Sequence, residues 1–121
     1  MPCPHHDIKI VQRSNRQSAV AAAAYQSGER LFSEYDQKQK YYAEKRGIVH
    51  TEIMLPPHAP PEYADRNTLW NAAEAIEKQW NSQLARRIVL AIPREIPPEQ
   101  HADLLRDYCR EFFVSKGMIA D

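Results

Sequence analysis

Four segments of the chain have the apolar pattern of β-strands: residues 7–13, 48–55, 87–92 and 118–121. In the first segment Ile8 and Ile10 alternate with polar residues, which predicts a strand with one face toward solvent. The third segment is a nearly continuous apolar run that ends at Pro93, a pattern typical of a strand buried on both faces. The fourth segment resembles a strand that is only beginning.

The first predicted helix covers residues 19–27. Ser18 precedes it and is a favourable N-cap, and the segment is rich in alanine, which has the highest helix propensity. Gly28 supplies a natural end. Because its side chains are small, this helix can lie close against a sheet.

Two further helices follow. Asp65 or Asn67 can cap the second, which runs to about residue 81 with one apolar face. That face consists of Leu69, Ala73, Ile76 and Trp80. The third helix opens with Pro97, Pro98 and an acid, and ends at Gly117. Its apolar stripe consists of Leu104, Leu105, Tyr108, Cys109, Phe112 and Phe113.

Polar loops connect these elements. Residues 29–47 are rich in tyrosine and in charged residues and have room for a small hairpin, whereas the proline-rich residues 56–61 cannot lie inside a sheet. The resulting order is β-α-β-α-β-α-β. We therefore predict an α+β fold in which helices pack on a mainly antiparallel sheet.

Composition is consistent with one globular domain over residues 1–121, with 43% hydrophobic and 26% charged residues. The net charge is zero, yet residues 1–50 hold eight Lys/Arg against five Asp/Glu, a bias in the direction expected of a half that contacts an anion such as nucleic acid. On charge alone, ordinary surface charge is the favoured explanation of this bias. We see no secretory signal, no membrane-spanning run and no disulfide framework in Cys3 and Cys109, so we expect a cytoplasmic protein.

Tyr25 is the candidate for covalent chemistry, since a tyrosine phenol can act as a nucleophile when the leaving group is held in place. Taken alone, a helical tyrosine more often packs half-buried on a sheet. The residues around Tyr25 favour the role of nucleophile over that of a packing residue. Residues 18–29, SAVAAAAYQSGE, resemble the first motif of the MobA/MobL family of plasmid-mobilisation relaxases, and further segments resemble that family in the same order: GIVHTEIMLP, LWN with Glu74, QLAR, LAIP and FVSKGM.

The resemblance implies a DNA-nicking relaxase domain of which this sequence is the N-terminal part. Its expected substrate is single-stranded or melted plasmid transfer-origin DNA, and auxiliary mobilisation proteins are expected partners. Tyr25 would attack one phosphodiester and retain the 5′ end as a phosphotyrosine. A divalent metal, Mg²⁺ or Mn²⁺, would assist in the complete family domain.

In this family three histidines, two of them in an H-x-H pair, bind the metal on the strand after the third helix and beside it. Here that strand would begin at Met118, and the sequence stops at residue 121. The histidines present form no H-x-H pair: His5, His6, His50, His58 and His101. We therefore expect no competent metal site within these residues. The alternative to a relaxase is a truncated, inactive remnant that at most binds DNA or partner proteins, and an unrelated small α/β domain is a third reading.

The resemblance also implies that basic residues around Tyr25 bind DNA. The expected nucleic-acid-binding residues are Arg13, Arg16, Arg30, Lys45 and Arg46. Interleaved Tyr and Lys/Arg suit single-stranded DNA because charges follow phosphates and rings stack on bases, although a solvated loop has the same composition. Arg87 stands where the family commonly has an acid. An arginine stays protonated and cannot act as a base, but it could contact a phosphate.

Overall fold

The computed structural model describes residues 6–42 and 46–121. Its strands are β1 (His6–Gln12), β2 (Leu31–Ser33), β3 (Lys38–Lys40) and β4 (Gln83–Leu90). Its α-helices are α1 (Ala19–Ser27), α2 (Arg66–Ile76) and α3 (His101–Phe112). Short 3-10 turns flank them at Arg13–Asn15, Pro61–Ala64, Pro98–Gln100 and Val114–Lys116. The α+β architecture predicted from the sequence is confirmed.

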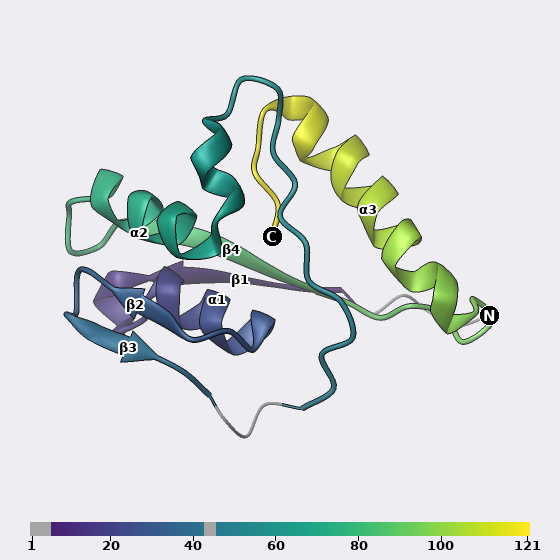
Figure 1. The fold of residues 1–121 in the computed structure, drawn as a ribbon, viewed down its shortest axis with the longest axis horizontal. Coiled ribbons are helices and arrows are strands. Elements are labelled where there is room, and N and C mark those ends of the chain that lie inside the picture. The colour runs from purple at the N-terminus through teal and green to yellow at the C-terminus, as the bar shows by residue number, and fades with distance from the viewer. Residues whose placement is uncertain (1–5, 43–45) are drawn as a thin grey trace.

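The central sheet pairs β1 with β4 in antiparallel order, with Lys9 opposite Arg87 and Val11 opposite Ala85. In Figure 1, α1 and α2 lie together over this strand pair. Val11 and Leu84 of the sheet are buried with Ala19 at the start of α1, and the partly buried Trp70 of α2 packs against them. The sheet and the two helices thus share one small core.

The hairpin predicted within residues 29–47 is present as β2 and β3. Leu31 joins the buried side of α1, and two asparagines of α2 hold the edge of β2. The Asn67 side chain accepts a hydrogen bond from the Phe32 N–H (2.7 Å), while the Asn71 side chain donates to the Phe32 carbonyl (2.8 Å) and accepts from Glu34 N–H (2.8 Å). These bonds place the tyrosine-rich hairpin beside α1.

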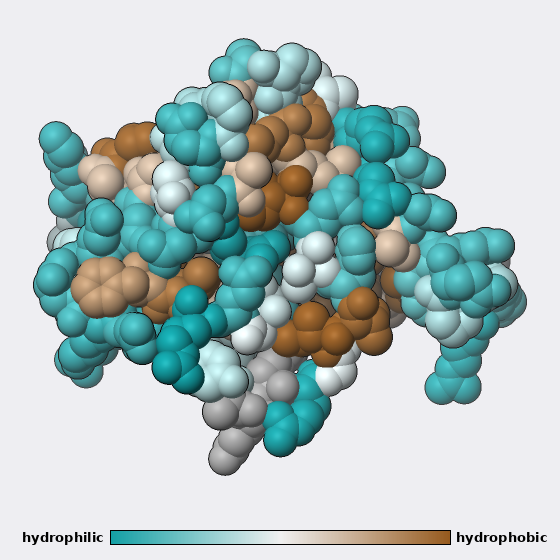
Figure 2. Space-filling view, viewed as in Figure 1, coloured by the Kyte–Doolittle hydropathy of each residue, from teal (hydrophilic) through white to brown (hydrophobic). Residues whose placement is uncertain are grey.

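The α3 helix lies at the periphery of the molecule (Figure 1), and none of its residues is buried. Leu104 is 40% exposed and Phe112 is 47% exposed. On the face shown in Figure 2, apolar residues form separate patches among polar ones. The described residues include no helix long and apolar enough to cross a membrane.

The predicted strands at 48–55 and 118–121 are wrong. Within the described residues they make only one isolated antiparallel bridge, between Met54 and Ala120, and Val49 is 94% exposed. A strand needs a neighbour for its backbone groups, and these segments meet at a single point. The apolar sequence of residues 48–55 therefore runs as extended chain along the surface.

Two other expectations need correction. The β4 strand is not buried on both faces, since Val89 is 43% exposed in a sheet that is two-stranded in the described residues. The α2 helix ends at Ile76, one turn before the predicted end, and Ile76 and Trp80 are 70% and 60% exposed. Its buried side is mostly polar: Arg66, Leu69, Asn71 and Glu74.

Candidate nucleic-acid cleft around Tyr25

The local sequence fixes both ends of the helix that carries Tyr25. The Ser18 side chain accepts a hydrogen bond from the Ala21 N–H (3.2 Å), as expected for an N-cap. At the other end Gly28 adopts φ 76°, and its N–H donates to the Ala24 carbonyl. A Cβ atom on Gly28 would lie 2.8 Å from the Ile48 side chain, so the position needs glycine for space as well as for backbone conformation.

A buried carboxylate from α2 completes the start of α1. Glu74 is 5% exposed, and its Oε1 accepts hydrogen bonds from the Ser18 hydroxyl (2.8 Å) and the Val20 N–H (3.2 Å). A negative charge at a helix N-terminus is stabilised by the helix dipole. Glu74 therefore fixes the position of α1 relative to α2, and with it the position of Tyr25.

Tyr25 itself is 39% exposed near the end of α1. Its ring meets Tyr42 edge to face, with centroids 5.4 Å apart and planes at 83°. The Arg87 guanidinium lies 5.9 Å from the centre of the Tyr25 ring. The predicted nucleophile is thus accessible and has an aromatic ring on one side and a cation on another.

These residues line an open cleft of about 600 Å³ between β1, α1 and the hairpin. Its cationic lining residues are Lys9, Arg13, Arg16, Lys40 and Arg87. Its aromatic lining residues are Tyr25, Tyr35, Tyr42 and Trp80. Among the described residues of the lining, the only carboxylates are Asp36, which pairs with Lys40 at 2.8 Å, and Glu74, which caps α1. An anionic, aromatic ligand such as single-stranded nucleic acid fits this lining.

The five predicted DNA-binding residues have different environments. Arg13 is 4% exposed and donates to the backbone carbonyls of Glu77 (2.7 Å), Gln79 (3.1 Å) and Glu74 (3.0 Å) at the end of α2. These bonds give Arg13 a structural role at the edge of the cleft that it also lines, and DNA contact by Arg13 stays a prediction.

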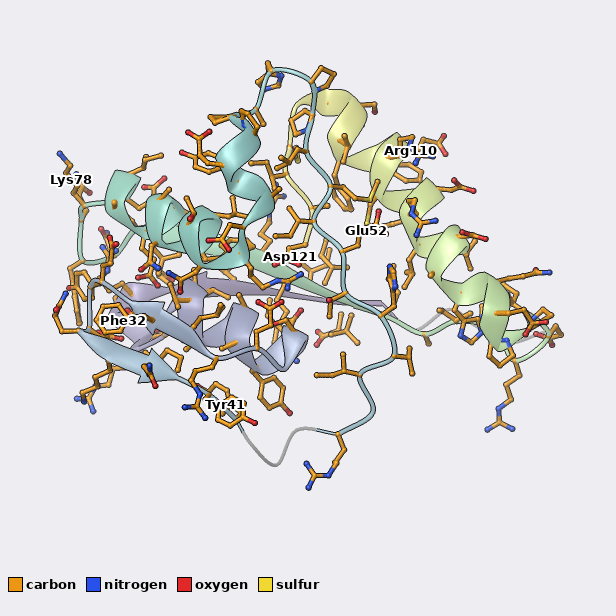
Figure 3. The ribbon with its side chains drawn as sticks, in the orientation of Figure 1. Phe32, Tyr41, Glu52, Lys78, Arg110 and Asp121 are labelled. Carbon is orange, nitrogen blue, oxygen red and sulfur yellow. The ribbon has the colours of Figure 1, made fainter. Side chains whose placement is uncertain are left out.

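Arg16, Arg30 and Arg46 are exposed, and Arg16 lines the cleft. Arg30 stacks over the Tyr41 ring at 4.6 Å. Figure 3 shows Tyr41 close to the hairpin. Lys45 lies outside the described residues. DNA contact by these four residues stays a prediction.

Sequence reasoning missed three residues that line the same cleft as Tyr25. Tyr42 belonged to the tyrosine-rich loop, but nothing in the sequence singled it out from Tyr35 or Tyr41. Trp80 was assigned to an apolar helix face and lines the cleft instead. Lys9 carried no signal, because its place in the same cleft as Tyr25 depends on how α1 packs on β1.

The donor atoms beside Tyr25 do not fit a divalent metal. The described part of the cleft lining holds no histidine, and its two carboxylates already have protein partners. Across residues 6–42 and 46–121 no three His, Cys, Asp or Glu side chains are grouped closely enough to share a metal ion. His50 instead bonds Glu52 (3.0 Å), and His101 contacts the Ile96 carbonyl (3.0 Å). The side chains of His5 and His6 lie outside the description.

Two charged clusters tie the remaining segments to the core. In the first cluster the buried Arg66 (6% exposed) forms ion pairs with Glu29, just after α1, and with both carboxylate oxygens of Asp121. The Asp121 carboxylate also accepts a hydrogen bond from the Trp70 indole N–H (2.8 Å). Figure 3 shows Asp121 beside α2, in the interior of the view. Asp121 is therefore anchored to the same helix that orients α1.

The second cluster joins α3 to the extended segment. Arg106 donates to both oxygens of Glu52 (2.8–3.1 Å), which Figure 3 shows next to α3. These bonds, with His50 adding to them, lower the pKa of Glu52 from its usual 4.5 to about 2. On the same helix, partial burial raises the pKa of the Cys109 thiol, which disfavours its reactive thiolate form.

The sequence of this chain is similar to known proteins over most of its length. The sequence profile described as the MobA/MobL family matches residues 17–121. Conjugal transfer protein TraA of Agrobacterium fabrum (strain C58) is 37% identical over the whole chain, and mobilization protein MobL of Acidithiobacillus ferridurans is 34% identical over 97% of it. The chain spans 12% of the length of that TraA and 30% of that MobL.

A solved structure has the same fold. It comes from work on the "Molecular Basis of Vancomycin Resistance Transfer in Staphylococcus aureus" and superposes with a TM-score of 0.89 at 32% sequence identity. The match covers 98% of this chain and 60% of that one.

Proposed function

Because this chain belongs to the MobA/MobL family, we propose that it acts in plasmid mobilisation as the Tyr25-bearing part of a relaxase. Its substrate would be single-stranded or melted transfer-origin DNA. The observation that carries the proposal is the half-exposed Tyr25 in an open cleft lined by cations and aromatic rings. Relatives named for conjugal transfer and mobilisation support the same role.

The proposed reaction is a transesterification. The Tyr25 Oη forms a bond to phosphorus, the bond from phosphorus to the 3′ oxygen breaks, and the DNA keeps its 5′ phosphate as a phosphotyrosine. The phenol loses one proton and the released 3′ oxygen gains one, so the reaction is proton-neutral overall. One phosphodiester replaces another, which allows the reverse attack to rejoin the strand.

The cleft supports this step by positioning the strand. Exposed cations would neutralise phosphates, and rings such as Tyr42 and Trp80 would stack on bases. Holding the phosphate next to the nucleophile is itself a large part of catalysis. The divalent metal implied by the resemblance stays a prediction, since the described residues beside Tyr25 do not supply its ligands.

The test is formation of a covalent protein–DNA adduct. The full product of the reading frame that encodes residues 1–121 is incubated in Mg²⁺-containing buffer with single-stranded oligonucleotides that tile the DNA flanking its gene, and adducts are resolved on denaturing gels. We expect an adduct that Tyr25→Phe abolishes and that Tyr108→Phe, on α3 and outside the cleft lining, retains. A parallel reaction in EDTA tests the metal expectation. Equal adduct in Tyr25→Phe refutes the assignment, and binding without any adduct favours a chain that only binds DNA.

A further inference from the structure

Arg87 lies on the cleft face of the sheet, close to the proposed nucleophile. Side chains opposite each other in an antiparallel pair point to the same face. Arg87 stands opposite Lys9 and, two residues along, Ala85 stands opposite Val11, which is buried against α1. Arg87 and Lys9 both line the cleft that contains Tyr25.

Two cations directly opposite each other on paired strands repel. Lys9 has only a long contact with Asp7 (3.7 Å), and among the described residues no carboxylate lies within ion-pair distance of Arg87. The sheet therefore holds a positive charge that the described part of the protein leaves uncompensated.

Arg87 also has an unsatisfied donor. Its Nε atom is buried and has no hydrogen-bond partner within the part of the chain that the structure describes. The Tyr25 ring does not replace that partner, because the guanidinium is 5.9 Å from its centre, whereas Arg13 and Arg30 approach their tyrosine rings to 4.3 and 4.6 Å. A buried donor without an acceptor costs free energy, which the side chain would recover by turning its guanidinium toward an anion bound in the cleft.

We infer that Arg87 binds a non-bridging oxygen of the phosphodiester that Tyr25 attacks. This rests on the proposed function. The planar guanidinium offers parallel N–H donors that match two phosphate oxygens, and it keeps its charge at any working pH. Placed beside the nucleophile, it would orient the phosphorus and stabilise the negative charge that grows on the oxygens during attack. It accepts no proton, so the phenolic proton leaves by another route.

The experiment measures binding rather than reaction. Affinity of the full chain for a fluorescein-labelled oligothymidylate is determined by anisotropy across a series of salt concentrations. Arg87→Met keeps the apolar part of the side chain and removes the charge, whereas Arg87→Lys keeps the charge and removes the parallel N–H donors of the guanidinium. Arg86→Met is the matched control, because Arg86 lies on the opposite face of β4. Circular dichroism checks that each variant is folded.

We expect Arg87→Met to weaken binding by about tenfold and to reduce the slope of log affinity against log salt by about 0.7, the contribution of one phosphate in a single strand. Arg87→Lys should keep the slope and lose part of the affinity, and Arg86→Met should change neither. If Arg87→Met and Arg86→Met have the same slope, Arg87 does not bind phosphate. That result leaves the proposed function standing if a Tyr25-dependent adduct still forms. A reduced slope for Arg87→Met with an adduct that persists in Tyr25→Phe would show that Arg87 contacts a phosphate, but not the phosphate that Tyr25 attacks, and would overturn the inference together with the proposed function.

Discussion

Substitution of Glu74 tests whether its carboxylate stabilises the start of α1. The substitution Glu74→Ala deletes the acceptor for both the Ser18 hydroxyl and the Val20 N–H. It also frees the Ser18 hydroxyl from the orientation in which it accepts from the Ala21 N–H. Because the site is 5% exposed, water cannot readily replace the lost acceptor.

The magnitude follows from the two bonds. A hydrogen bond to a charged group contributes about 1.5–3 kcal/mol, and the 2.8 Å bond from Ser18 belongs in that range. The 3.2 Å bond from Val20 is longer and contributes roughly 1 kcal/mol. We expect Glu74→Ala to lower the free energy of unfolding by about 3 kcal/mol. Glu74→Gln keeps an oxygen acceptor and should cost about 1 kcal/mol through loss of the charge at the helix terminus.

Urea unfolding followed by circular dichroism measures the effect. With an m-value of about 1.5 kcal/mol/M for a domain of this size, the Glu74→Ala midpoint should fall by roughly 2 M. Glu77→Ala is the matched control, since it removes an exposed carboxylate from the end of the same helix. If Glu74→Ala and Glu77→Ala unfold within about 0.5 kcal/mol of each other, Glu74 does not anchor α1 and the reasoning fails.

Two further predictions concern the end of α1 and the extended segment that follows the hairpin. Gly28→Ala should destabilise the chain by about 1–2 kcal/mol from backbone strain alone, and by more once the Ile48 side chain is displaced. Gly47→Ala, with no atom of the described residues within 4 Å of its Cβ, should show the strain alone in thermal unfolding. The lowered pKa of Glu52 means that its contact with Arg106 stabilises the folded state fully above about pH 4.5 and loses that contribution as the pH falls toward 2. NMR titration of the Arg106 guanidinium should follow this range, and a signal unchanged down to pH 2 would contradict the contact.

The sequence by itself determined the features that depend on neighbouring residues. Ser18 and Gly28 delimit α1 as predicted, because capping and left-handed termination involve only the backbone a few residues away. Asp65 caps α2 by accepting from the Thr68 N–H in the same way, at 3.0 Å. The position of Tyr25 on its helix, and the helices and hairpin of the fold, could therefore be predicted from sequence.

Only the tertiary structure decided which residues surround Tyr25. Arg87 reaches it because β4 pairs with β1 in one register, and Arg13 bonds the end of α2 because that end lies within its reach. The apolar pattern of residues 48–55 predicted a strand, yet a strand exists only where a neighbour satisfies its backbone, and that segment has a single bridge. The local sequence pattern determines the local backbone conformation, whereas strand pairing, side-chain burial and charge compensation depend on segments far apart in the chain.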